Sequence, residues 1–458
     1  MNTSYLRMVS KKKLFNKALI LSWGGVIINF GGFLIILPIA TNSLNLIDFN
    51  FWLYSTTLLA VGIIIESSIV NPFNRLLIYA KDKKPIDNGK GNKYLNSIND
   101  SLLIMFRITM ILSFIVFIST YIIGNVSTDK YNKLLDVNLY LILISLVCFF
   151  RVISTFAVSI LHTEGLISIQ KEIQFYLLLL KTILTIIVLY YYSSLLFVFI
   201  INAISVIIEC FFYYYISLYK LQYYKKLKES KFSINVFNSI KKPVVNTFTI
   251  RVGGYFIAQS MAILSMQLSV EESTKLLFSI KCISLVYRIS LMPFHVRLPD
   301  FVKYRANEEI DKIKRLYIKE MRLSILVYLL GILILIFLAK DIAKTIDVKV
   351  YFLDLHQLVF LSIIFFLELH HVTHSMIYET TNNVPFMKVS IFSGIAIFLF
   401  GFISNKLGYG VTELLLIQFI VQVSGNNWYP VYLSFKSTNW KLICYIKDMF
   451  GVNHGNTI

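Results

Sequence analysis

Twelve long apolar runs constrain this chain more than any other feature of its sequence. An α-helix needs about 20 apolar residues to cross the hydrocarbon core of a bilayer. Hydrophobic residues make up 57% of the 458 residues, which is more than a soluble protein can bury. We therefore expect an all-α polytopic membrane protein with twelve transmembrane helices. The runs lie at residues 18–40, 48–71, 102–124, 138–161, 173–192, 194–217, 244–266, 274–295, 323–339, 355–377, 386–405 and 410–434.

A repeated motif divides the chain into halves. The stretch GIIIESSIVNPFNRLLIYAKDKK (62–84) recurs imperfectly as LVYRISLMPFHVRLPDFVKYR (285–305), and SILHTEG (159–165) resembles SMIYETT (375–381). Both pairs are separated by about half of the chain, which indicates an internal duplication. We expect two repeated six-helix bundles around a central lumen. The predicted parts are an N-terminal bundle (1–217), a cytoplasmic interfacial linker (218–243), a C-terminal bundle (244–435) and a cytoplasmic tail (436–458).

Basic residues predict the orientation. The formal net charge is +19, and most Lys and Arg lie in the N-terminal segment and in the segments 72–101, 218–243 and 296–322, which share one side of the expected topology. This asymmetry predicts that both termini are cytoplasmic. We interpret the excess as topogenic charge facing anionic lipid, not as a nucleic-acid surface. The four cysteines show neither disulfide nor metal-site spacing.

Charged residues inside the apolar runs are the candidate functional groups, because burying charge in a membrane is costly. The cations Arg107, Arg151, Lys181, Arg251, Lys281 and Arg288 outnumber the deep anions Glu66, Glu209 and Glu368. A lumen with surplus cations suits an anionic substrate. We expect substrate binding by Arg151, Lys181, Arg251 and Arg288. For any one of them, an internal ion pair or a side chain that reaches the interface remains the alternative.

The anions and a histidine cluster are candidates for gating or ion coupling. The set is Glu66, Glu209, Glu368, His371 and His374, the last three from the stretch ELHHVTH (368–374). This stretch lacks the H-E-x-x-H pattern of zinc proteases, so we expect no metal site. Alignment through the two prolines places Glu66 one position from Arg288. The two could pair across the bundles and close the cytoplasmic side, or each could pair within its own half.

The paired halves, the Pro-Phe motif followed by basic residues and the charged residues inside the runs together resemble the Wzx-type polysaccharide flippases. These belong to the multidrug/oligosaccharidyl-lipid/polysaccharide exporter superfamily. The resemblance implies a bacterial plasma (inner) membrane protein that moves an undecaprenyl-pyrophosphate-linked oligosaccharide, such as an O-antigen unit of lipopolysaccharide, to the outer leaflet by alternating access. It also implies contact with membrane lipids and with a polysaccharide polymerase and chain-length regulator. No nucleotide-binding loop is present and no cofactor is expected.

Three other functions are alternatives to this one. A drug/cation antiporter of the same superfamily would favour an acidic lumen for its cationic substrates. A polysaccharide polymerase, which is an enzyme, normally has a large external loop, whereas the longest external loop expected here spans only 340–354. A lipid II flippase of the superfamily usually has two more helices. The substrate's sugars, the coupling ion and the oligomeric state have no sequence signal.

Overall fold

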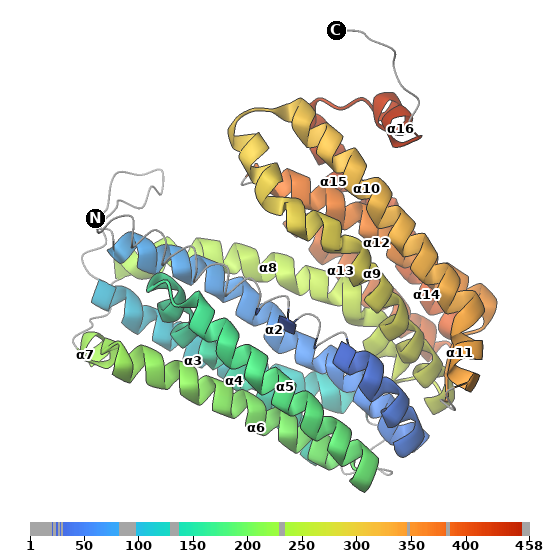
Figure 1. The fold of residues 1–458 in the computed structure, drawn as a ribbon, viewed down its shortest axis with the longest axis horizontal. Coiled ribbons are helices and arrows are strands. Elements are labelled where there is room, and N and C mark those ends of the chain that lie inside the picture. The colour runs from blue at the N-terminus through green and yellow to red at the C-terminus, as the bar shows by residue number, and fades with distance from the viewer. Residues whose placement is uncertain are drawn as a thin grey trace, which may run out of the picture. The chain divides into compact units, whose positions relative to one another are not determined.

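All regular secondary structure in the described residues is helical (Figure 1). Within that part of the chain, nine helices are long and apolar enough to cross a membrane. The other three predicted runs fall on a shorter apolar helix at Gly31–Ser43, on α8 and on α14–α15. The expected class, an all-helical multi-span membrane protein, is confirmed. The computed structural model describes residues 21, 24, 25, 28, 31–81, 98–128, 137–228, 234–345, 349–381 and 385–450.

The first compact unit spans Met1–Val252 (unit 1). Helix α4 lies at its centre and packs against α2, α3 and α6. A glycine allows α2 and α4 to approach closely, since a Cβ at Gly62 on α2 would lie 3.1 Å from the Cα of Cys148 on α4. The elements of this unit are α2 (Leu46–Lys81), α3 (Ile98–Ser127), α4 (Val137–Thr163), α5 (Ile167–Tyr192), α6 (Leu195–Tyr214), the π-helical segment η2 (Tyr215–Lys220) and α7 (Tyr223–Lys228).

The second compact unit spans Gly253–Ile458 (unit 2), and α8 (Ile234–Ser265) crosses the boundary between the two. Helix α9 packs against α10 and α12, as α2 packs against α3 and α4 in unit 1. The further elements are α9 (Val270–Ala306), α10 (Ile310–Leu333), η3 (Ile334–Leu338), α11 (Ala339–Thr345), α12 (Leu355–Glu379), α13 (Met387–Lys406), α14 (Val411–Val421), η4 (Gln422–Asn426), α15 (Trp428–Thr438) and α16 (Leu442–Phe450).

The two Pro-Phe motifs lie inside helices, so the predicted helix ends were wrong. Helix α2 continues through Pro72 to Lys81, and α9 continues through Pro293 to Ala306. A proline removes one intrahelical hydrogen bond and bends a helix. Packing supports the helix on both sides of that bend, because the phenylalanine after each proline is fully buried. The segment 296–322, expected to be a loop, is mostly the end of α9 and the start of α10.

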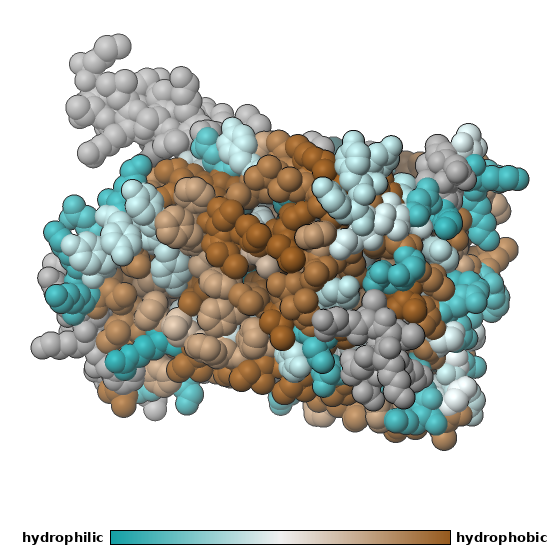
Figure 2. All heavy atoms as spheres, turned by 90° about the horizontal axis from the view of Figure 1, so that it is seen from below, coloured by the Kyte–Doolittle hydropathy of each residue, from teal (hydrophilic) through white to brown (hydrophobic). Residues whose placement is uncertain are grey.

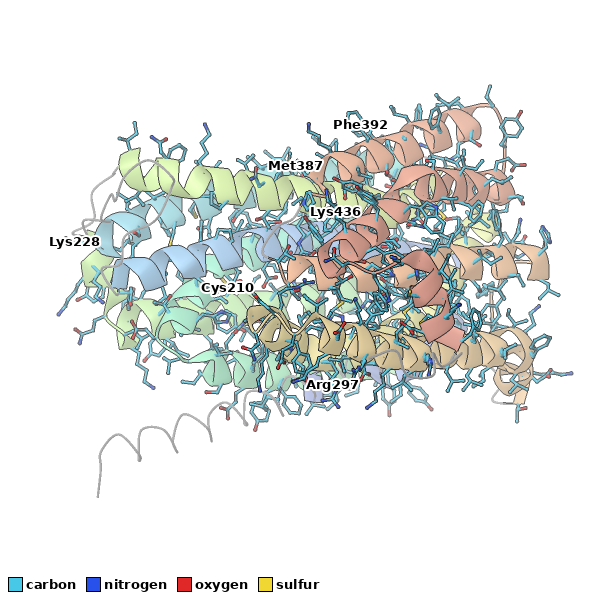
Figure 3. All side chains as sticks on the ribbon, turned by 90° about the horizontal axis from the view of Figure 1, so that it is seen from above. Cys210, Lys228, Arg297, Met387, Phe392 and Lys436 are labelled. Carbon is cyan, nitrogen blue, oxygen red and sulfur yellow. The ribbon has the colours of Figure 1, made fainter. Side chains whose placement is uncertain are left out.

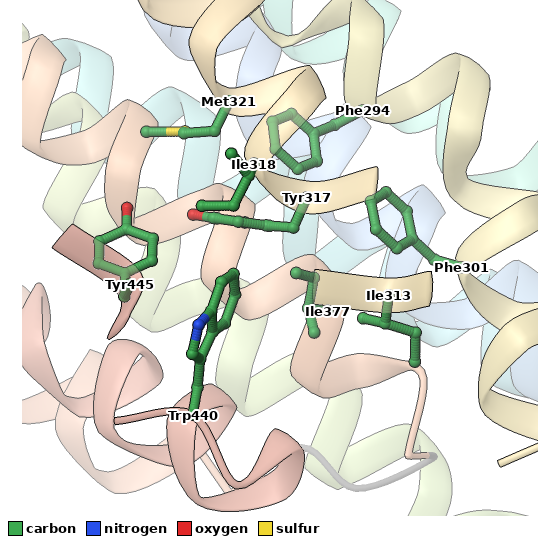
Figure 4. Packing of buried hydrophobic residues seen from close by; sticks show 9 residues of the cluster. All are labelled: Phe294, Phe301, Ile313, Tyr317, Ile318, Met321, Ile377, Trp440 and Tyr445. Atoms are coloured by element: carbon green, nitrogen blue, oxygen red, sulfur yellow. The ribbon is translucent and has the colours of Figure 1, made fainter. Parts of the chain in front are cut away.

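The C-terminal segment predicted as a tail packs onto unit 2. Trp440 and Tyr445 are 7% and 8% exposed, and Tyr445 lies on α16. Both side chains join an aromatic and aliphatic cluster that includes Tyr317 of α10 and Phe294 of α9 (Figure 4). Helix α16 is therefore part of the folded unit. The cluster contains Phe294, Phe301, Ile313, Tyr317, Ile318, Met321, Ile377, Trp440 and Tyr445.

Hydrophobic side chains cover much of the surface seen in Figure 2. On α10 they recur at intervals of three and four residues, which places them on one side of the helix. We call this set the α10 apolar stripe, and its members are about half exposed or more. Such a surface is expected for a helix that faces lipid. The stripe consists of Leu323 (46% exposed), Leu326 (55%), Leu330 (51%) and Leu333 (50%) on α10, and it continues to Phe337 (67%) on η3.

Candidate functional site

Four of the predicted site residues come together in unit 1, each from a different helix. Arg151 Nη1 on α4 lies 3.9 Å from Glu66 Oε2 on α2. Lys181 on α5 experiences the charges of Arg151 and of Glu209 on α6. Glu66 is likewise close enough to Glu209 for their charges to interact. We call these four residues the unit 1 charge cluster.

Both cations of the cluster keep donors that a ligand could use. Arg151 and Glu66 form an ion pair, but the 3.9 Å between their nearest atoms is too long for a hydrogen bond. The side chains of Arg151 and Glu66 are 33% and 24% exposed. Lys181 Nζ donates to Asn202 Oδ1 at 3.4 Å, and an ammonium group has three donors. The guanidinium and the ammonium can therefore accept a second, anionic partner.

Glu209 is held by a tyrosine. The Tyr213 hydroxyl donates to Glu209 Oε1 at 2.7 Å and also lies 3.4 Å from the Gln170 carbonyl oxygen. Tyr213 is almost fully buried. This bond fixes the carboxylate against α6 while its charge still acts on Lys181. Sequence reasoning identified Glu209 but missed Tyr213, although its position one turn later is a spacing that brings side chains together.

A second polar network in unit 1 was not predicted, although Asn74 and His162 lie within the two repeated motifs. His162 Nε2 on α4 lies 2.6 Å from Gln170 Oε1 on α5, and its Nδ1 lies 3.0 Å from Asn74 Nδ2 on α2. The Gln170 oxygen can only accept, so His162 donates from Nε2. Its Nδ1 then accepts from the Asn74 amide. The three residues connect α2, α4 and α5. Asn74 comes shortly after Pro72, in the turns of α2 that were expected to be loop.

A smaller charged group lies on α9 and α12 of unit 2, and the remaining predicted residue, Arg251, belongs to the part of α8 in unit 1. Arg288 is exposed on α9, and its charge acts on Lys281 two turns earlier. The charges of Arg288 and of Glu368 on α12 both act on Tyr287. Glu368 Oε2 is buried without a hydrogen-bond partner among the described residues. Arg251 is exposed on α8 and forms no ion pair within the described part of the chain.

The histidines of α12 contact the C-terminal helices. His371 Nδ1 donates to the Asn426 carbonyl oxygen at 2.8 Å. His374 is fully buried, with Nδ1 2.6 Å from Ser434 Oγ and its ring centroid 4.8 Å from that of Tyr317. These contacts attach η4 and α15 to α12. Within the described residues, no three His, Cys, Asp or Glu side chains are grouped so that they could hold a metal ion.

No family model matches the chain, and no curated protein sequence matches it. Solved structures do. An inward-facing multidrug resistance MATE family transporter of the MOP superfamily has a TM-score of 0.63 at 11% identity, over 94% of this chain and 99% of the other. The lipid II flippase MurJ, in an inward closed conformation, has a TM-score of 0.63 at 14% identity, over 94% and 90%.

A third similar structure is a MOP superfamily transporter from Pyrococcus furiosus, described as having a binding pocket of reverse polarity. Its TM-score is 0.56 at 11% identity, over 93% of this chain and 97% of the other. At such low identity these similarities show the fold alone. The chain is thus a multi-pass membrane protein with the fold of MOP superfamily transporters.

Proposed function

We propose that this protein is a flippase that moves undecaprenyl-pyrophosphate-linked oligosaccharide repeat units from the cytoplasmic to the outer leaflet of the bacterial plasma membrane. The observation that carries the proposal is the unit 1 charge cluster, in which Arg151 and Lys181, both on apolar helices, are close enough for their charges to interact. Both termini are cytoplasmic in this proposal. The protein would act by alternating access, and a polymerase and a chain-length regulator would receive its product.

The chemistry of the cluster fits a pyrophosphate. The planar guanidinium of Arg151 can bind two phosphate oxygens at once, and Lys181 adds a compact point charge. Glu66 is the anion paired with Arg151, but the two groups are 3.9 Å apart. A doubly charged ligand can therefore compete with Glu66 for the Arg151 guanidinium. Arg251 and Arg288, both exposed on their helices, are the further donors we assign. The fold similarity to a lipid II flippase supports the transport of a lipid-linked sugar.

The acidic residues supply the coupling in this proposal. Glu66 and Glu209 lie beside the two cations, so proton binding by either carboxylate would change the charge that the substrate meets. Glu368 would play this part in unit 2. His371 and His374 hold the C-terminal helices, and we propose that they act on gating through that attachment.

A drug/cation antiporter is the second candidate. Two carboxylates in the same cluster and the similarity to MATE transporters favour it. A cationic drug would bind Glu66 and Glu209 in place of Arg151. The two functions make opposite demands on the cations. Removing Arg151 and Lys181 should harm flipping, whereas it should leave or improve binding of a cationic drug.

The test uses a strain lacking the gene and complemented with single and double alanine variants of Arg151 and Lys181. Each lost charge-assisted contact is worth about 1.5–3 kcal/mol, so substrate affinity should fall by about tenfold to a hundredfold. Lipid-linked oligosaccharide should accumulate in the inner leaflet, fully assembled. Lys220→Ala on η2 is the matched control, because it removes an exposed cation elsewhere in unit 1.

Arg151→Lys sharpens the result. Lysine keeps the charge but cannot bind two oxygens as a fork, so activity should stay low if the contact is bidentate. Normal delivery of repeat units to the outer leaflet by the double variant, at wild-type protein levels, would contradict the proposal. Normal delivery followed by failed polymerisation in the deletion strain would favour the polymerase.

A further inference from the structure

Helix α16 carries an exposed apolar side that nothing in the site explains. Leu442, Ile443, Ile446 and Phe450 are 57%, 68%, 46% and 81% exposed. At 3.6 residues per turn they fall within an arc of about 100°. The helix has nine residues and lies outside the candidate membrane spans. A contiguous apolar surface on such a segment marks a site of interaction.

A different side of α16 is fixed to unit 2. Tyr445 packs against Tyr317 of α10, with ring centroids 6.2 Å apart, and its hydroxyl lies 3.1 Å from His370 Nε2 of α12. Arg322 Nε of α10 donates to the Met449 carbonyl oxygen at 3.0 Å, and Arg322 Nη2 donates to the carbonyl of Asp448. Two of the last four carbonyls of α16 are thereby satisfied. The exposed apolar side has a fixed direction.

Arg322 also indicates the depth of α16 relative to the bilayer. Residues 311–322 of α10 include seven charged side chains, whereas the α10 apolar stripe begins at the next residue, Leu323. The change from charged to lipid-facing residues along a helix marks the boundary between water and hydrocarbon. Because Arg322 contacts α16 directly, α16 lies at that boundary.

Basic residues surround the apolar side. Lys436 on α15 and Lys441, just before α16, are exposed, and Lys447 on α16 is half-buried (Lys436 is labelled in Figure 3). We propose that α16 is an interfacial helix that lies in the bilayer surface. Its apolar side enters the boundary between headgroups and acyl chains, and the three lysines face the phosphates of anionic lipids. The occupant of the surface is the bilayer, not a protein.

The experiment uses the full-length chain with its native cysteines replaced and a single bimane-labelled cysteine. Ile443→Cys reports on the apolar side. Asp448→Cys is the matched control on the same helix, because Asp448 is exposed but points away from the apolar arc. In nanodiscs containing phosphatidylglycerol and doxyl-labelled lipid, quenching at position 443 should be about twofold or more greater than at 448.

Equal quenching at the two positions, or none at 443, would overturn the proposal. The bimane at position 443 could instead become more shielded from water as the protein-to-lipid ratio rises, without being quenched by doxyl lipid. That result would assign the surface to a second copy of the chain. Hydrogen exchange of the unmodified protein provides an independent measure. Exchange over 441–450 should be slower in phosphatidylglycerol nanodiscs than in phosphatidylcholine nanodiscs, and equal rates would contradict the role of the lysines. Neither readout depends on transport.

Discussion

Alanine at Gly253 should destabilise unit 2, whereas alanine at the neighbouring Gly254 should not. A Cβ at Gly253 would lie 2.8 Å from the carbonyl carbon of Ser390 and 2.9 Å from the amide nitrogen of Ile391, both backbone atoms of α13. A Cβ at Gly394 on α13 would in turn lie 2.8 Å from the Gly253 carbonyl oxygen. The two backbones are in direct contact, as small residues permit between membrane helices. At Gly254 a Cβ would meet nothing within 4 Å.

The loss of stability expected for Gly253→Ala depends on which atoms must move to make room for the added methyl group. Backbone atoms cannot swing aside as a flexible side chain can, so α8 and α13 must separate. Overpacking of this kind costs about 1–3 kcal/mol, and replacing glycine returns about 0.4–1 kcal/mol through the unfolded chain. The free energy of unfolding should fall by about 1–2 kcal/mol for Gly253→Ala, which is a factor of about 5–30 in the folded-to-unfolded ratio. For Gly254→Ala it should stay level or rise slightly.

Thermal stability in detergent is the direct assay, measured as the fraction of monodisperse protein that remains after heating. The two variants add the same methyl group to adjacent positions of one helix, so composition and helix propensity cancel in the comparison. A lower midpoint for Gly253→Ala alone is expected. Matching midpoints for the two variants would refute the close contact between α8 and α13.

Three further predictions concern single contacts. Tyr213→Phe removes the donor to Glu209, so stability should fall by about 1–3 kcal/mol and transport should fall with it, while protein levels report on folding separately. Arg322→Ala removes the donor to the Asp448 and Met449 carbonyls of α16. A thiol reagent should therefore label Cys444, the free cysteine on that helix, faster than in the wild type. An unchanged labelling rate would show that Arg322 does not hold the helix. Burial raises the pKa of Tyr445 to about 12, from about 10 in an unfolded chain. The protonated phenol therefore favours the folded state, and the packing of α16 should weaken as pH rises from about 10 to 12. Alkaline difference absorbance of the wild type against Tyr445→Phe measures this, and ionisation near pH 10 would count against burial.

The helices could be predicted from the sequence because bilayer thickness imposes a length that apolar runs reveal. Their ends could not. Pro72 and Pro293 carry a strong local signal for termination, but burial of the following phenylalanines supports the helix beyond them. The turn at Asn307–Glu309 lies where the sequence is merely polar. The interruption of the twelfth run by η4 also has no signal, because a π-turn preserves composition and changes only the register.

The candidate site could be predicted in part. Charge inside apolar runs is rare enough that Arg151, Lys181, Glu66 and Glu209 stand out one by one. These residues lie on four different helices and are brought together by the packing of those helices around α4. That packing cannot be read from any one apolar run. The repeated motifs contain His162 and Asn74, but their pairing could not be predicted, because polar residues near helix ends are common and follow no period.

The long helices α9 and α10 offer a practical route to imaging this protein. Helix α9 has 37 residues, or about 56 Å at 1.5 Å per residue, against a hydrocarbon core of about 30 Å. It meets α10 in a short turn at Asn307–Glu309 and packs along that helix, so the turn of the hairpin lies at the end of a helix that is longer than the hydrocarbon core is thick. A small rigid domain inserted in that turn would stand clear of the micelle and move with unit 2. Such a fiducial would give particle images of a nearly all-membrane protein the asymmetric feature that their alignment requires.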